Sequence, residues 1–278
     1  MKIKLLLFIF FTNVVLASAS HIDTLRVESN CMNKSIPNLV ILPDSYANQK
    51  EQFPVLYLLH GATGDFKDWL KKVPDLAKYA DLYNFIIVCP DGGFTSWYFD
   101  SPVDPAMKYE TYISQELVAQ VDQSYPTIKG RHGRAISGLS MGGHGAFYLA
   151  FRHQDIWGAA GSTSGGLDIR PFPNNWDLSK RLGIYADNQE NWEKNTVINQ
   201  VHLLDGKKLK LIFDCGIDDF FYDANNRMHE LLLERNIPHD YTARPGKHNN
   251  EYWANSIKYQ LLFFSDFFHS GNEGSSKN

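Results

Sequence analysis

Cysteine is scarce in this sequence, and its spacing excludes several classes of small domain. Cys31, Cys89 and Cys215 are the only three among 278 residues, and no C-x-x-C pair occurs. An odd, widely spaced set builds neither a disulfide scaffold nor a zinc knuckle, although a bridge between two of the three stays open. Cys89 and Cys215 each end an apolar run, which predicts buried thiols rather than nucleophiles.

Strong charge of one sign is also absent, as are the motifs of nucleotide binding. The formal net charge is −4, from 27 basic and 31 acidic residues, which disfavours nucleic acid as a partner. No G-x-G-x-x-G accompanies any turn, which argues against a dinucleotide site. With 44% apolar residues the chain can form a large core. We expect a single domain over residues 20–270 and a disordered polar tail at 271–278.

The apolar run at the N-terminus is too short to cross a bilayer. Lys2 and Lys4 precede an apolar stretch at 5–16, whereas a transmembrane helix needs about 20 apolar residues. The small residues A-S-A follow at 17–19, where a signal peptidase cleaves. These features predict a signal peptide at residues 1–19, cleaved after Ala19, and a secreted or periplasmic protein without stable membrane insertion.

Short apolar and β-branched runs alternate with helical patterns along most of the chain. The predicted strands are 24–29, 36–42, 54–60, 85–89, 134–137, 157–163, 209–214 and 239–244. The first two are expected to form an antiparallel lead-in, and several of the others are apolar throughout, as in strands covered on both faces. Apolar stripes predict helices at 112–125 and 253–268. The pattern favours an α/β fold with a mostly parallel sheet of about eight strands and helices on both faces.

One segment interrupts this alternation. Residues 167–199 are rich in Asn, Asp, Trp and Pro and carry no clear strand–helix pattern. We interpret them as an insertion over the carboxyl edge of the sheet, where open α/β sheets bind ligands. It is therefore the expected lid or specificity element.

A predicted strand at 134–137 runs into G-L-S-M-G-G at 138–143, and a helical pattern follows. A serine on so sharp a turn from strand to helix is held above the sheet in a strained conformation, and the glycines two positions before and after it prevent collisions. The context favours a nucleophile elbow with Ser140 at its tip over a glycine-rich turn that carries a structural serine.

A serine nucleophile needs a histidine to take its proton and a carboxylate to orient that histidine. The strand at 209–214 leads into a loop that holds Asp218 and Asp219, so either can be the acid. His248 lies in the loop after the last predicted strand and completes the order Ser, acid, His. The oxyanion formed during attack needs two backbone donors, for which we expect the N–H groups of Met141 and Ala62.

These residues resemble the esterase D-like family of α/β-hydrolases over roughly residues 32–268. The matching motifs are L-L-H-G (58–61), P-D-G (90–92), S-W-Y-F-D-S-P (96–102), Y-E-T-Y (109–112), G-L-S-M-G-G (138–143), C-G-I-D-D-F (215–220) and P-G-K-H (245–248). The family includes feruloyl and acetylxylan esterases, S-formylglutathione hydrolases and mycolyltransferases. The resemblance implies an α/β-hydrolase fold, and its C-G-x-x-D pattern implies Asp219 rather than Asp218 as the acid.

The resemblance leaves the substrate open. An exported protein is unsuited to S-formylglutathione, so we expect a serine carboxylesterase that removes acetyl or feruloyl groups from carbohydrates, without cofactor or metal. Trp97 and Tyr98 are candidates for stacking on a sugar or phenolic ring, and Asp65 for a polar contact; simple loop packing explains them equally well. The rivals are an acyltransferase to a sugar hydroxyl, a thioesterase, and a carbohydrate-binding protein without activity.

Overall fold

The computed structural model describes residues 21–48, 51–204 and 209–272. The predicted signal peptide therefore lies outside the described residues, as does most of the predicted tail, although the last helix continues to Asn272. All three cysteines are free, and Cys89 and Cys215 are buried as predicted. Burial raises the pKa of both buried thiols. Within the described residues no helix is both long and apolar enough to span a membrane.

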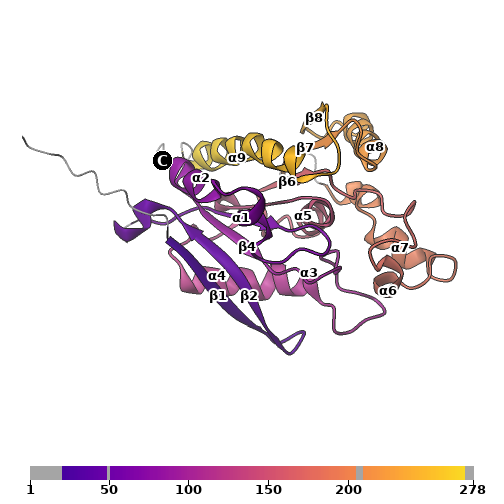
Figure 1. The fold of residues 1–278 in the computed structure, drawn as a ribbon, viewed down its shortest axis with the longest axis horizontal. Coiled ribbons are helices and arrows are strands. Elements are labelled where there is room, and N and C mark those ends of the chain that lie inside the picture. Colours follow the sequence, from indigo (N-terminus) through magenta and orange to yellow (C-terminus); the bar gives the residue numbers. More distant parts are fainter. Residues whose placement is uncertain (1–20, 49–50, 205–208, 273–278) are drawn as a thin grey trace, which may run out of the picture.

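Eight strands form one sheet (Figure 1). They are β1 His21–Ser29, β2 Lys34–Leu42, β3 Val55–Leu59, β4 Ile86–Pro90, β5 Arg134–Gly138, β6 Ala159–Thr163, β7 Lys210–Gly216 and β8 Asp240–Arg244. Their order is β1-β2-β4-β3-β5-β6-β7-β8. The β1–β2 hairpin is antiparallel and β2 runs antiparallel to β4, while the pairs from β4 to β8 are all parallel. The predicted mostly parallel sheet is confirmed.

Helices cover both faces of the sheet (Figure 1). They are α1 Asp68–Lys72, α2 Leu76–Tyr83, α3 Tyr109–Thr111, α4 Val118–Ser124, α5 Met141–Arg152, α6 Leu178–Leu182, α7 Gln189–Asn195, α8 Tyr222–Glu234 and α9 Asn250–Asn272. A π-helical segment, Tyr112–Leu117, joins α3 to α4, and a 3-10 segment, Val197–Leu203, follows α7. The two helices predicted from apolar stripes are thus present, the first of them with a π-helical turn.

Successive side chains along each strand point to opposite faces of the sheet, so the interior consists of two hydrophobic cores, one on each face. On β3, Tyr57 and Leu59 point toward the side that carries α4, α5 and α8, whereas Leu56 and Leu58 pack with α1, α2 and α9. All four side chains are fully buried, as expected for a strand covered on both faces. Because the parallel strands share one carboxyl edge, the loops after β3, β5, β7 and β8 gather there.

Candidate active site

Ser140 lies at the tip of a sharp turn between β5 and α5. Its backbone has φ 56° and ψ −117°, a strained conformation for a residue with a side chain. The turn also requires glycine at position 142, since a Cβ there would collide with the carbonyl oxygen of Leu59 and lie 2.7 Å from that of His60. A Cβ at Gly138 would strike Gly142 itself. The glycines therefore let the elbow pack directly against the end of β3.

His248 and Asp219 complete a chain of hydrogen bonds from the serine. Nε2 of His248 lies 2.9 Å from Ser140 Oγ, and Nδ1 lies 2.9 Å and 3.1 Å from Asp219 Oδ2 and Oδ1. Asp219 is buried, and its Oδ1 also accepts a hydrogen bond from the backbone N–H of Phe221. With Nδ1–H donated to the carboxylate, Nε2 is free to accept the serine proton. Asp218 is exposed, so the structure selects Asp219 from the two carboxylates.

Two backbone N–H groups next to Ser140 have no recorded acceptor within the described residues. They belong to Met141, the first residue of α5, and to Ala62, in the loop after β3. This loop approaches the elbow closely, because a Cβ at Gly61 would lie 3.5 Å from Ser140 Cβ. Neither predicted oxyanion donor is thus used by another hydrogen bond in the described residues, and the loop that contains Ala62 lies close to Ser140.

His60 braces that loop from beneath. Its Nε2 accepts a hydrogen bond from the Gly92 N–H at 2.8 Å, and its Nδ1 lies 2.8 Å from the Gly61 carbonyl oxygen. Burial lowers the pKa of His60, which favours the neutral ring that can donate at Nδ1 and accept at Nε2. The imidazole thereby holds in place the loop after β3, which contains Ala62.

A cavity of about 300 Å³ opens over Ser140. Two of its aromatic walls are Trp176, from the segment predicted to be the lid, and Phe220, whose ring lies 5.7 Å from that of Trp176 and 4.3 Å from His248. The lining also includes an ion pair of 3.0 Å between Lys72 and Asp68. The cavity thus combines an aromatic face with hydrogen-bonding groups.

The structure contradicts the predicted ring-stacking roles of Trp97 and Tyr98. Both side chains are buried, at 1% and 0% exposure, and both residues have positive φ, which turns them into the interior. The Tyr98 hydroxyl donates to the His60 carbonyl oxygen, and Trp97 Nε1 donates to the carbonyl oxygen of Trp176. Burial raises the pKa of Tyr98 well above its usual value. These two side chains support the loop after β3 and the insertion at 167–199, and they do not contact a ligand.

Asp65 also lies outside the lining of the Ser140 cavity. Its carboxylate accepts from the Lys67 backbone N–H at 2.7 Å and pairs with Lys71 at 3.0 Å on the surface. Burial alone would raise the pKa of Asp65, but the bonds from Lys71 and Lys67 hold it lower. The charged side chains that line this cavity are instead Asp68 and Lys72, which no motif in the sequence marks.

The comparisons agree with this geometry. The model of the family described as "Putative esterase" matches residues 29–264. The chain belongs to this esterase family. It has the α/β-hydrolase fold.

Three relatives illustrate the range of the family. "Esterase MT1326" of Mycobacterium tuberculosis is 35% identical over 137 residues, which is 47% of this chain and only 29% of that protein. "Acetyl esterase" of Caldicellulosiruptor saccharolyticus is 24% identical over 82% of this chain and 92% of its own length. A solved "ferulic acid esterase" superposes with a TM-score of 0.78 at 28% identity, covering 90% of this chain and 98% of its own.

Proposed function

We propose that this esterase removes acetyl or feruloyl groups from carbohydrates outside the cytoplasm, through an acyl-enzyme on Ser140. The observation that carries the catalytic assignment is the unbroken chain from Ser140 Oγ through His248 to Asp219. The acyl groups are suggested by the relatives named as an acetyl esterase and a ferulic acid esterase. Export is supported by the N-terminal pattern of Lys2, Lys4 and A-S-A at 17–19.

The first half of the reaction forms the acyl-enzyme. As Ser140 Oγ attacks the ester carbonyl carbon, its proton passes to His248 Nε2, and Asp219 stabilises the imidazolium. The carbonyl oxygen becomes an oxyanion that accepts from the N–H groups of Ala62 and Met141; loss of one such donor costs about 3 kcal/mol in a well-studied protease. When this tetrahedral intermediate collapses, the bond between the acyl carbon and the alcohol oxygen breaks. The alcohol oxygen takes the proton from His248, and the alcohol leaves.

The second half returns the free enzyme. Water gives a proton to His248 Nε2 and attacks the acyl carbon, and collapse of the new oxyanion releases the acid and restores the Ser140 hydroxyl. A sugar hydroxyl in place of water would give the transferase reaction, so the choice of acceptor separates these two activities. Trp176 and Phe220 supply the aromatic face against which a feruloyl ring or a sugar ring would lie.

The decisive experiment compares substrates on one purified protein. Acetylated xylan, methyl ferulate, p-nitrophenyl acetate and S-formylglutathione are assayed with and without added sugar acceptors. We expect the highest kcat/KM on acetylated xylan or methyl ferulate, with free acid as the product. Preference for S-formylglutathione, or transfer of the acyl group to the added sugar, would replace the proposal with one of its rivals.

The nucleophile is tested separately. Ser140→Ala should lower kcat on p-nitrophenyl acetate by about 10⁴ to 10⁶-fold. Ser124→Ala, at an exposed position near the end of α4, is the matched control and should leave kcat unchanged. Export is tested by mass spectrometry of the protein recovered from its natural host. The mature chain should begin at Ser20.

A further inference from the structure

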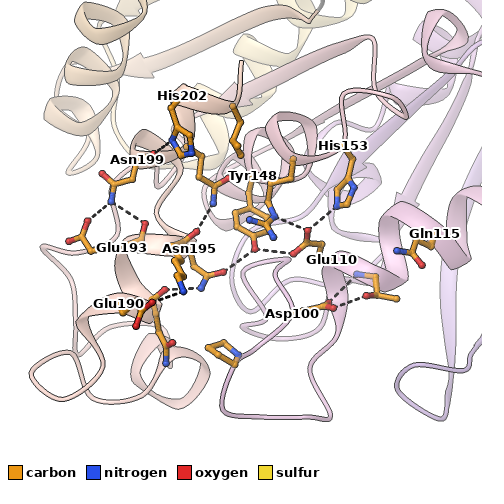
Figure 2. A pocket seen from close by; sticks show the side chains of 17 residues that line it. Asp100, Glu110, Gln115, Tyr148, His153, Glu190, Glu193, Asn195, Asn199 and His202 are labelled. Carbon is orange, nitrogen blue, oxygen red and sulfur yellow. Dashed lines mark hydrogen bonds and ion pairs between the residues drawn. The ribbon is translucent and has the colours of Figure 1, made fainter. Parts of the chain in front are cut away.

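A second, larger cavity of about 1000 Å³ lies apart from the Ser140 cavity (Figure 2). Three segments form it: the 100–115 region, the C-terminal end of α5, and the stretch from Glu190 to Leu203 in and after the insertion. The two cavities share no lining residue in the part of the chain that the structure describes. The volume reaches the upper end of the range of about 300–1,000 Å³ for small-molecule sites.

Most of the charged side chains of this cavity pair with an opposite charge within the protein. Three glutamates and their partners are Glu110 with Arg152 (2.7 Å), Glu190 with Lys194 (2.6 Å) and Glu193 with Arg170 (2.9 Å). Asp100 accepts from both the backbone N–H and the hydroxyl of Thr111. Because each lining cation faces a carboxylate, the cavity offers no unbalanced positive charge that would attract an anion.

The rest of the lining consists mostly of neutral groups that both donate and accept hydrogen bonds. Five amides line the cavity: Gln115, Asn191, Asn195, Asn199 and Gln200. Gln115 is exposed, with no hydrogen bond recorded for its side chain among the described residues. Gln200 is 3% exposed, and its Oε1 accepts no hydrogen bond in the described structure. The site thus has free hydrogen-bonding capacity at its rim and an unpaired acceptor in its wall.

Apolar atoms make up more than half of the surface of this cavity, although few of its lining residues are apolar. Pro102 and Leu203 are its only aliphatic lining residues, and the ring of Tyr148 is itself buried against its neighbours. The Tyr148 hydroxyl lies 2.9 Å from both Glu110 Oε2 and Asn195 Oδ1, which holds the α5 end to the insertion (Figure 2). A sugar would find both kinds of contact that it needs here: hydrogen-bonding groups for its hydroxyls and carbon surface for the C–H faces of its rings.

We propose that this cavity is a second, non-catalytic binding site for a neutral oligosaccharide. This inference rests on the proposed function: the site would hold an unesterified stretch of the carbohydrate while Ser140 hydrolyses an ester elsewhere on it. Gln115 and the free Oε1 of Gln200 bind sugar hydroxyls, and the apolar surface of the cavity contacts the C–H faces of the rings. Weak affinity is expected, because each exchanged hydrogen bond replaces one to water.

The experiment measures binding of unesterified sugars by isothermal titration calorimetry. The protein is first inactivated at Ser140 with phenylmethylsulfonyl fluoride, which fills the catalytic cavity. Xylohexaose, cellohexaose and maltohexaose are the neutral probes, and trigalacturonate and inorganic phosphate are the anionic probes. We expect saturable one-to-one binding of at least one neutral probe, equal in inactivated and untreated protein, and no binding of the anions.

Variants assign that binding to the cavity. Gln115→Trp combined with Leu203→Trp places two bulky rings at exposed lining positions and should weaken binding at least tenfold. The matched controls are Ala119→Trp and Leu233→Trp, which lie at exposed positions outside the lining and should change affinity less than twofold. Circular dichroism and thermal unfolding check each fold; if the double variant is not folded, Gln115→Trp alone is used.

Several results would overturn the proposal. They are no binding of any neutral probe at millimolar concentration, binding that disappears when Ser140 is blocked, binding of the anions alone, or equal loss in the control variants. Hydrolysis of acetylated xylan by the untreated protein is measured in parallel. Loss of binding with intact hydrolysis refutes only the second site, whereas binding without hydrolysis of carbohydrate esters refutes only the proposed function.

Discussion

Asp219→Asn is the change for which the structure gives the most specific expectation. The Phe221 N–H donates to Asp219 Oδ1 at 2.9 Å, so an asparagine at this position would keep its amide oxygen on that side. Its NH₂ group would then occupy the position of Oδ2, 2.9 Å from His248 Nδ1. The amide oxygen lies farther from Nδ1, at 3.1 Å, so the nearer NH₂ group favours Nδ1 as an acceptor and the ring proton on Nε2. In that tautomer His248 cannot take the proton of Ser140.

The magnitude follows from this loss of the general base. The corresponding substitution in a serine protease lowers kcat by about 10⁴ with the geometry intact. That factor equals about 5.4 kcal/mol of transition-state stabilisation. We therefore expect kcat on p-nitrophenyl acetate to fall by about 10⁴ while KM changes less than threefold, because the cavity walls are untouched. Steady-state kinetics give both constants, and ¹⁵N spectra of labelled histidine report the tautomer.

Asp218→Asn is the matched control. It removes the same charge one residue earlier, at an exposed position, and should retain kcat within twofold. If Asp219→Asn kept more than a tenth of the parent kcat while folded, or if both variants lost activity equally, Asp219 would not orient His248 and the reasoning would be wrong.

Three further expectations concern acid stability, the aromatic wall and the elbow. Burial alone would raise the pKa of Glu110, but hydrogen bonds from His153, Arg152 and Tyr148 lower it to about 2, so its stabilising contribution is complete above pH 4.5 and is lost as the pH falls toward 2. The free energy of unfolding should therefore fall by up to about 3 kcal/mol from this group over that interval, and Glu110→Gln should flatten this fall in urea titrations. Trp176→Ala should lower kcat/KM for methyl ferulate about tenfold, at the upper end of what aromatic pairs contribute. For p-nitrophenyl acetate, kcat/KM should fall less than threefold. Equal losses on the two substrates would exclude the ring as a contact of the acyl group. Gly142→Ala should destabilise the protein by about 3 kcal/mol or more, because the added Cβ meets backbone and not a movable side chain; an unchanged melting temperature would contradict this packing.

The sheet and the catalytic chain were predictable because they depend on local signals and on one rule of topology. Each of the eight strands is a short apolar or β-branched run, and the structure contains a strand within or overlapping every predicted range. Parallel strands place their following loops at one edge, so a serine after β5, an acid after β7 and a histidine after β8 had to approach one another. Only the choice between Asp218 and Asp219 needed the family pattern.

The direction of side chains in the loops was not predictable in the same way. Trp97 and Tyr98 follow a P-D-G turn, where exposure is the ordinary expectation, yet two successive positive φ angles, 58° and 62°, send both rings inward. Such angles are unfavourable for aromatic residues and persist only because packing enforces them: a Cβ at Gly145 would lie 2.5 Å from Tyr98 Cδ2. The aromatic face at the site instead comes from Trp176 and Phe220, far apart in sequence.

No sequence signal predicted the larger cavity. Its walls come from three polar segments separated by tens of residues; the first includes parts of the motifs at 96–102 and 109–112, but neither motif indicates a second site. Polar residues at a surface are the rule, so their gathering around one cavity is visible only when the chain is folded. The insertion at 167–199 was recognised, but its double role, with Trp176 at the smaller cavity and α7 at the larger, depends on how it packs.

This packing joins the two cavities through one buried imidazole. His144 Nε2 lies 3.0 Å from the carbonyl oxygen of Asn195, a residue that lines the larger cavity, and Nδ1 lies 3.1 Å from that of Trp97. Trp97 in turn donates to the Trp176 carbonyl oxygen. Burial lowers the pKa of His144 to about 4, so at neutral pH the ring has one proton for two acceptors. The contacts that place Asn195 at the larger cavity and Trp176 beside the serine therefore belong to one continuous set of side-chain to carbonyl contacts.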